Sequence, residues 1–278
     1  MDEKLEEEIT NLVNNGKIND ALKMARDAFP ESPDDVSDLL NRIGCDFVQR
    51  RDYSTSEKVF TGLIAIDPKN VDAYYNRGNA ALDKGMMDVA IRDYNRVLEI
   101  KPMAMAYVNR GLAYMEKGDM GKALSDFNEA LKTNPDTADA YHYRGLIYME
   151  KGDMEKAIED FSKAVEINPE YAEPYCYRGL AYLDKEDSKK ALGDLNKAIE
   201  LNPGFGLAYA RRGLAYLSRG NLNRAIMDCD KAIRLDRRNP EAYYYRGMAH
   251  YHDGNHRKAK DDYKKACSLD PGLKDQPY

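Results

Sequence analysis

The sequence predicts an all-α protein in which pairs of helices stack side by side into an α-solenoid. Three observations support this fold class. A glycine recurs every 33 or 34 residues, a proline closes most of the units so defined, and the apolar residues inside each unit follow helical spacing. A chain of 278 residues with 43% hydrophobic residues can bury a continuous core over such an array.

The recurring glycine is the clearest feature of the repeat. An alanine stands twelve residues after it in six units, and a proline closes six units. Self-similarity at a fixed period of this length is the signature of a repeat architecture. The glycines are Gly44, Gly78, Gly111, Gly145, Gly179, Gly213 and Gly247, and the prolines are Pro68, Pro102, Pro135, Pro169, Pro203 and Pro271.

Each unit is predicted to form two helices joined by a short turn. In the stretch YHYRGLIYMEKGD, residues 141–153, Tyr141, Gly145 and Tyr148 lie at i, i+4 and i+7 and share one helix face. We expect Gly145 to lie opposite the small Ala157, where close helix approach offsets the ~1 kcal/mol cost of glycine in a helix. The KGD turn ends the first helix, and the proline separates one unit from the next.

These units resemble the tetratricopeptide repeat, a helix–turn–helix unit with the pattern W-x2-L-G-x2-Y…A-x3-F…P. The resemblance covers residues 37–271 as seven copies, with tyrosine in place of the tryptophan and arginine in place of the leucine in most of them. Residues 1–36 resemble a degenerate eighth copy that caps the array, and residues 272–278 are interpreted as a frayed tail. The resemblance implies one continuous right-handed superhelix whose first helices line the concave side.

An arginine directly precedes the glycine in six units, and an aspartate follows that arginine by sixteen residues. The first full copy lacks both, because it has Ile43 and Val59 in these places. Their joint presence and absence predict a ladder of structural ion pairs between the two helices of a repeat; the alternative is a set of surface charges that never meet. The predicted pairs are Arg77–Asp93, Arg110–Asp126, Arg144–Asp160, Arg178–Asp194, Arg212–Asp228 and Arg246–Asp262.

The resemblance also implies where a partner would bind, namely in a concave groove lined by the first helices. Apolar residues and tyrosines on that face predict an interaction site, and acidic residues along its edges favour a peptide or amphipathic helix with basic flanks. The alternative is that the groove leucines pack between adjacent first helices and expose little. The predicted groove residues are Tyr75, Asn76, Asn79, Val108, Asn109, Leu112, His142, Tyr143, Leu146, Tyr177, Leu180, Arg211, Leu214, Tyr244, Tyr245 and Met248.

Composition argues against several other classes. A net charge of -6 does not suit a general nucleic-acid binder, and no apolar run approaches the ~20 residues of a membrane span. The acidic start lacks the order of a secretion signal, so we expect a cytoplasmic protein. The four cysteines form no C-x-x-C pair, and Gly254 interrupts the histidines His250, His252 and His256. We therefore expect no metal, no cofactor and no enzymatic activity.

Two functions fit these observations. The first is an adaptor that binds a segment of another protein in the groove. The second is a scaffold that assembles with itself, either through the groove or head to tail. Residues 1–36 hold 10 acids and 4 bases, which gives -6, whereas residues 206–278 hold 15 bases and 9 acids, which gives +6. Opposite ends of this kind can meet in a heterologous contact that propagates.

Overall fold

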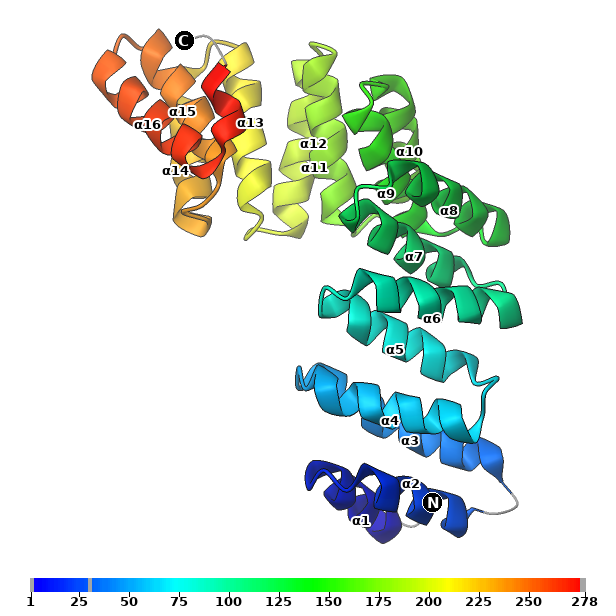
Figure 1. Ribbon diagram of the computed structural model, residues 1–278. Coiled ribbons are helices and arrows are strands. Elements are labelled where there is room, and N and C mark those ends of the chain that lie inside the picture. Colours follow the sequence, from blue (N-terminus) through cyan, green and yellow to red (C-terminus); the bar gives the residue numbers. More distant parts are fainter. Residues whose placement is uncertain (1–2, 30–31, 276–278) are drawn as a thin grey trace. The chain divides into compact units, whose positions relative to one another are not determined.

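The computed structural model describes residues 3–29 and 32–275. Within these ranges the chain forms sixteen α-helices, a terminal 3-10 helix and no strand, which confirms the predicted all-α class (Figure 1). The helices follow one another as α1 Glu3–Asn14, α2 Ile18–Ala28, α3 Pro33–Gln49, α4 Tyr53–Ile66, α5 Val71–Asp83, α6 Met87–Ile100, α7 Ala104–Glu116, α8 Met120–Thr133, α9 Ala138–Glu150, α10 Met154–Ile167, α11 Ala172–Asp184, α12 Ser188–Leu201, α13 Gly206–Ser218, α14 Leu222–Leu235, α15 Pro240–His252, α16 His256–Leu269 and η1 Pro271–Asp275.

The chain divides into two compact units, Met1–Ala140 and Tyr141–Tyr278. In each unit, a first helix packs on the second helix of its own pair, and that second helix packs on the first helix of the next pair. First helices of neighbouring pairs also touch, as α5 and α7 do in one unit and α13 and α15 in the other. Each unit is therefore a stack of helix pairs, which is the α-solenoid arrangement. Continuity of the array across residue 140 stays a prediction.

The turn inside each pair is closed by a cap. Gly152 adopts a φ of 77°, the left-handed conformation that ends α9, and the Asp153 side chain then accepts a hydrogen bond of 3.2 Å from the backbone N–H of Lys156 at the start of α10. The same aspartate cap starts α8 and α12, at Asp119 and Asp187. In the turn before α12 the left-handed position is held by Glu186, with a φ of 59°, where a side chain costs free energy.

The repeated helix glycine lies against a side chain of the second helix of its own pair. A Cβ atom on Gly145 would stand only 2.8 Å from Cε1 of Phe161, on the second helix of the same pair. The predicted approach at the alanine is seen in three other repeats, where such a Cβ would also lie 3.2 to 3.4 Å from the carbonyl oxygen of Ala191, Ala225 or Ala259. Phe161 stands four positions beyond Ala157 and fills the space against Gly145. The same contact recurs between Gly111 and Phe127. The missing Cβ makes room for a buried ring, and that burial offsets the poor helix propensity of glycine.

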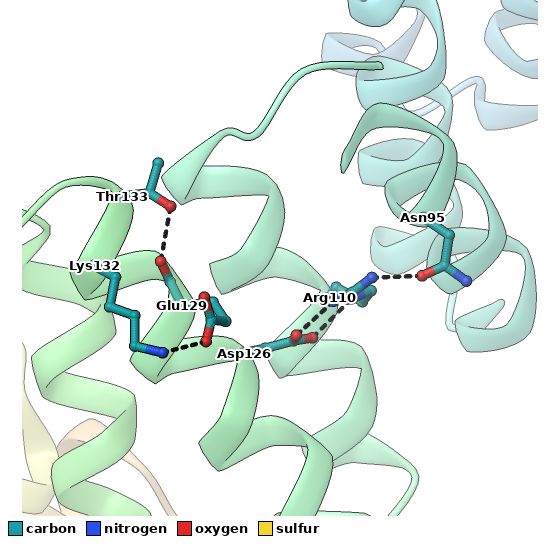
Figure 2. Close-up of polar contacts among 6 residues, drawn as sticks. All are labelled: Asn95, Arg110, Asp126, Glu129, Lys132 and Thr133. Carbon is teal, nitrogen blue, oxygen red and sulfur yellow. Dashed lines mark hydrogen bonds and ion pairs between the residues drawn. The ribbon is translucent and has the colours of Figure 1, made fainter. Parts of the chain in front are cut away.

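The six arginine–aspartate pairs form, each with two hydrogen bonds. Figure 2 shows Arg110, whose Nε and Nη2 donate to the two carboxylate oxygens of Asp126 at 2.8 and 2.6 Å. In all six pairs these distances lie between 2.6 and 2.8 Å. The aspartates are buried or nearly so. Two parallel bonds to a planar guanidinium fix the angle between the helices as well as their distance.

The same arginines also reach the preceding helix pair, which the sequence analysis did not predict. Nη1 of Arg110 donates to Oδ1 of Asn95 on α6 at 2.6 Å, so one guanidinium joins α6, α7 and α8 (Figure 2). Nη1 of Arg178 reaches Oγ of Ser162 in the same way, at 3.0 Å. Equivalent bonds link Arg77 to Thr61, Arg212 to Asn196 and Arg246 to Asp230. The ladder thus holds successive repeats together.

The two ends of the array differ from the interior. The predicted cap, residues 1–36, comprises α1, α2 and the start of α3, and its residues 1–2 and 30–31 lie outside the described part. At the other end, Pro271–Asp275 forms a 3-10 helix that contacts α16, so this part of the predicted tail is folded. Residues 276–278 of that tail also lie outside the described part.

Candidate functional site

The second unit contains an apolar pocket on the face of its first helices. The pocket has a volume of about 340 Å³. Its lining residues come from three successive first helices and from the beginning of one second helix. The lining residues are Met149 on α9, Met154 on α10, Leu180, Leu183 and Asp184 on α11, and Leu214 and Ser218 on α13. Leu180 and Leu214 are among the predicted groove residues named above. Met149 and Leu183 continue the same predicted i, i+4, i+7 stripes, and Asp184 is one of the acidic residues expected at the edge.

Helical spacing explains why these side chains converge. Leu180, Leu183 and Asp184 lie at i, i+3 and i+4 on α11, so they share one face. Leu214 and Ser218 lie at i and i+4 on α13, one repeat later. The leucines are half-buried. Their exposure is therefore intermediate between the two alternatives considered from the sequence, an open groove and close packing between first helices. They pack against their neighbours and still leave apolar surface for a ligand.

The rim of the pocket is acidic. The exposed carboxylate of Asp184 takes part in no ion pair with any residue that the structure describes, whereas the adjacent Lys185 is paired with Glu155. The Ser218 hydroxyl donates to the carbonyl of Ala215 at 3.0 Å, so its oxygen remains able to accept a hydrogen bond. The site therefore offers apolar surface, one unpaired negative charge and one acceptor. This combination suits an apolar side chain that is followed or preceded by a base.

Three predicted groove residues are buried, and for these the prediction is wrong. Val108, His142 and Arg211 expose only 1, 4 and 5% of their surface, so a partner cannot contact them without rearrangement. All three lie on first helices, on the side that packs against neighbouring elements. The helical period identifies the face to within about one position, and a shift of one position separates groove from core.

His142 is enclosed by aromatic rings. The centroids of Tyr143, Phe161, Tyr171 and Tyr177 lie 5.0 to 5.8 Å from the imidazole centroid. Its Nδ1 atom has no hydrogen-bond partner. Burial lowers the pKa of His142 to about 4, since no nearby group stabilises the charged form. The residue is therefore a neutral core histidine and not a partner contact.

Arg211 is held inside a buried polar cluster of the second unit. Its Nε donates to Oε2 of Glu241 at 3.4 Å, its Nη1 lies 3.6 Å from Sγ of Cys176, and its guanidinium stacks 4.4 Å from the ring centroid of Tyr177. Burial raises the pKa of the Cys176 thiol to about 11, although the charge of Arg211 opposes this. The thiol is thus protonated and unreactive at neutral pH. Tyr245 donates to the same Glu241 carboxylate at 3.5 Å.

In the first unit the predicted amide groups bond to one another. Asn79 Oδ1 accepts from the Tyr94 hydroxyl at 2.8 Å and from Asn109 Nδ2 at 2.9 Å, and Asn109 Nδ2 also lies 3.2 Å from the Tyr75 hydroxyl. Asn76 Nδ2 donates to Asn41 at 3.4 Å. The first set of bonds forms a network across α5, α6 and α7, and the second joins α5 to α3. Much of the hydrogen-bonding capacity of these groups is therefore used before any partner arrives.

The other predicted groove residues are half-buried. Leu112 belongs to the first unit, and Tyr143, Leu146, Tyr177, Tyr244, Tyr245 and Met248 belong to the second. Met154 and Ser218 also line the pocket but are not among the residues predicted from the sequence. Met154 is the first residue of a second helix, and only its place directly after the turn, beside the end of α9, could have indicated its role.

Two other kinds of site, a metal centre and a membrane span, are not found in the described part of the chain. Over residues 3–29 and 32–275, no group of three or more His, Cys, Asp and Glu side chains is arranged to hold a metal ion. No helix of the described chain combines the length and the apolar character needed to cross a bilayer.

Comparison with protein-family models gives repeated matches along the chain. A model described as TPR repeat matches residues 111–152, 145–186 and 213–254. Two models described as Tetratricopeptide repeat match residues 240–273 in one case and residues 71–103 and 172–205 in the other. No curated protein matches the chain.

Solved structures with similar folds are tetratricopeptide repeat proteins or complexes that contain comparable arrays. A tetratricopeptide repeat protein from Parabacteroides merdae is 24% identical, with a TM-score of 0.66 over 86% of this chain and 96% of that chain. A chain of the APC/C hetero-tetramer Cut9-Hcn1 is 15% identical, with a TM-score of 0.72 over 91% of this chain and half (50%) of that chain. YrrB, described as a TPR protein with an unusual peptide-binding site, is 24% identical, with a TM-score of 0.51 over 64% of this chain and 92% of that chain. At these identities the likeness shows the fold.

Proposed function

Because this chain belongs to the tetratricopeptide repeat family, we propose that it is a non-enzymatic adaptor that binds a segment of another protein on the face of its first helices. Proteins built from such repeats generally serve as protein-interaction scaffolds. We further propose that the partner segment binds in the concave groove, and within it at the pocket of the second unit.

The single observation that carries the proposal is the pocket of about 340 Å³ between α9, α10, α11 and α13. Apolar surface gathered from several repeats is unusual on a water-exposed face unless a partner covers it. Covering Leu180 and Leu214 would add hydrophobic stabilisation at about 25 cal/mol per Å² of apolar surface removed from water. YrrB, which shares the fold, is described as having a peptide-binding site, and this is consistent with the proposal.

The charge of the rim narrows the class of partner. Asp184 is exposed and without an ion pair in the described chain, and Glu150 at the end of α9 is likewise exposed. A peptide or amphipathic helix that inserts an apolar side chain and carries a lysine or arginine beside it satisfies both features of the pocket. The proposed partner is therefore an apolar segment with basic flanks.

A capture experiment followed by titration tests this proposal. The full chain is used to capture binders from an extract of its native host, and a synthetic peptide of the bound segment is then titrated. We expect Leu180→Ala/Leu214→Ala to weaken binding by roughly 10-fold, since covering the remaining surface of each half-buried leucine contributes about 0.7 kcal/mol. The control Leu131→Ala/Leu201→Ala removes two half-buried leucines from second helices. Equal losses in both variants, with circular dichroism showing intact folding, would count against the pocket.

The basic character of the partner is tested separately. Asp184→Lys should weaken binding of the same peptide and remove part of its salt dependence, because the base of the peptide would then meet a like charge. Glu159→Lys on α10 makes the same change in net charge at an exposed position outside the pocket. If the two variants bind equally, the charge of the rim plays no part in recognition.

A second function, self-assembly into a scaffold, is supported by the distribution of charge. The first 36 residues carry a net charge of -6 and residues 206–278 carry +6. Complementary ends of this size steer association between copies. Such assembly can occur head to tail or through the groove, and the mass of the protein at different salt concentrations distinguishes a monomeric adaptor from an assembling scaffold.

A further inference from the structure

The last helix pair leaves an aromatic pocket uncovered. This pocket, here called the C-terminal end pocket, has a volume of about 310 Å³ and is lined by Tyr251, His256, Ala259, Lys260 and Tyr263. Tyr251 is 41% exposed, and its ring lies 5.1 Å from that of His256. One repeat earlier, Ile226 occupies the place of Lys260, on a helix that packs against the following α15. In the described chain only η1 follows α16, so part of this stacking face stays open.

The helix that carries this pocket is strongly basic and its bases are unpaired. Within the described residues, none of the five bases of α16 takes part in an ion pair: Arg257, Lys258, Lys260, Lys264 and Lys265. Earlier second helices differ, since Lys156 pairs with Asp153 and Lys190 with Asp187 at their N-terminal caps. The corresponding cap of α16 is the neutral Asn255, which leaves Lys258 without that partner.

The opposite end of the chain has an apolar pocket whose rim carries two aspartates and one lysine. The N-terminal end pocket has a volume of about 450 Å³ and is lined by Leu5 on α1 and by Asp20, Lys23, Met24, Asp27 and Ala28 on α2. The α2 residues lie at i, i+3, i+4, i+7 and i+8, so they form one continuous stripe. Neither Asp20 nor Asp27 forms an ion pair with a residue of the described chain. Glu7 and Glu8 on α1 are also exposed.

We propose that these two end pockets bind each other between copies of the chain, with the α16 face of one copy packed on the α1–α2 face of the next. In this contact Lys260 and Lys264 face Asp20 and Asp27, and the rings of Tyr251 and His256 cover Leu5 and Met24. The occupant of each pocket is thus a second copy, because each end supplies the apolar surface and the opposite charge that the other lacks. A methionine sulfur against aromatic rings is a favourable contact. The inference rests on the second proposed function and specifies its interface.

Such a contact is heterologous, since the two surfaces that meet are different. Each copy retains one free end of each kind, so assembly propagates into open chains unless the geometry closes a ring. Exposed charge pairs are screened by salt, and the Debye length falls from ~10 Å at 0.1 M to ~3 Å at 1 M ionic strength. The assembly should therefore grow with protein concentration and shrink with salt.

Sedimentation velocity and light scattering on the full chain test the proposal. At low salt we expect the weight-average mass to rise above the 31.6 kDa of one chain as concentration increases, and to return to that value near 1 M NaCl. Lys260→Glu/Lys264→Glu and Asp20→Lys/Asp27→Lys should each abolish association. A mixture of the two variants should restore it, because the reversed end of one complements the reversed end of the other. All four positions are exposed, so folding is expected to survive.

The control variant Lys101→Glu/Lys189→Glu makes the same change in net charge as Lys260→Glu/Lys264→Glu, at exposed positions away from both end pockets. It should associate like the wild type. Association that persists in both end variants would overturn the end-to-end interface while leaving self-assembly through the groove in place. A monomer at every concentration and salt would overturn both, and the adaptor function would be unaffected.

Discussion

Replacement of Arg144 by alanine should destabilise the protein by about 3–5 kcal/mol, because it leaves a buried carboxylate without its counter-charge. Arg144 donates from Nε and Nη2 to the two oxygens of Asp160 at 2.8 and 2.7 Å, and the Asp160 side chain is only 4% exposed. The guanidinium also lies 5.4 Å from the ring centroid of Tyr141. Truncation of the arginine removes these contacts and leaves the Asp160 carboxylate without the two hydrogen bonds.

The pH dependence of this loss identifies its cause. Burial raises the pKa of Asp160 above its usual value, and the hydrogen bond and charge of Arg144 oppose that rise. In Arg144→Ala the opposing contribution is gone, so the pKa of Asp160 rises further and the carboxyl takes up a proton at a higher pH. The protonated carboxyl is neutral and costs less to bury. The difference in unfolding free energy between wild type and variant should therefore narrow as the pH falls below neutrality.

Equilibrium urea denaturation followed by circular dichroism measures these differences. Arg144→Ala/Asp160→Asn should recover most of the stability lost in Arg144→Ala, since the amide removes the buried charge at nearly the same volume. Arg234→Ala, an exposed arginine of α14 outside any ion pair of the described chain, is the matched control and should change stability by no more than about 0.5 kcal/mol. A loss below ~1 kcal/mol for Arg144→Ala, or no recovery in the double variant, would refute the reasoning.

Three further predictions follow from local contacts. Gly145→Ala should lower the melting temperature, because its Cβ would lie 2.8 Å from a buried ring. Gly193→Ala should raise the melting temperature, because its Cβ would have no atom within 4 Å and alanine has the better helix propensity. A change of the same sign in both variants would contradict the described packing. The free energy of unfolding of the wild type should fall by about 3 kcal/mol between pH 6.5 and about pH 4, because the folded-state pKa of His142 is lowered to about 4. His142→Phe should lack this part of the pH dependence in melting curves. A maleimide at a pH of about 8 should label the half-buried Cys267 before Cys176, whose pKa is raised to about 11, and mass spectrometry showing the reverse order would contradict the described burial.

The fold and the ion-pair ladder could be predicted because their signals repeat with constant residue types. Arginine and aspartate appear and disappear together, so their pairing is visible in the sequence. The hydrogen bond from the arginine Nη1 to the preceding helix pair was not predictable in the same way. Its acceptors are Thr61, Asn95 and Ser162 in three of the repeats, and a position that changes residue type gives no repeat signal even though a hydrogen bond forms each time.

The groove was harder to predict, because periodicity defines a face and burial depends on neighbouring elements. His142 lies in the predicted stripe, yet Tyr171 and Tyr177 from the following pair enclose it. Arg211 is similarly covered by contacts with Tyr177 and Glu241. The sequence of a single repeat does not contain all of the side chains that cover it, so the depth of each groove position depends also on the repeats on either side.

Methyl NMR on the partner complex tests the central claim most directly, namely that the first-helix pocket of the second unit receives the partner. The chain has 12 methionines, and Met149 and Met154 lie in the pocket while Met227 on α14 is 68% exposed outside it. In protein labelled at the methionine methyl groups, addition of the partner segment should shift the signals of Met149 and Met154 and leave that of Met227 unchanged. A shift of Met227 with no change at Met149 and Met154 would contradict the proposed binding face.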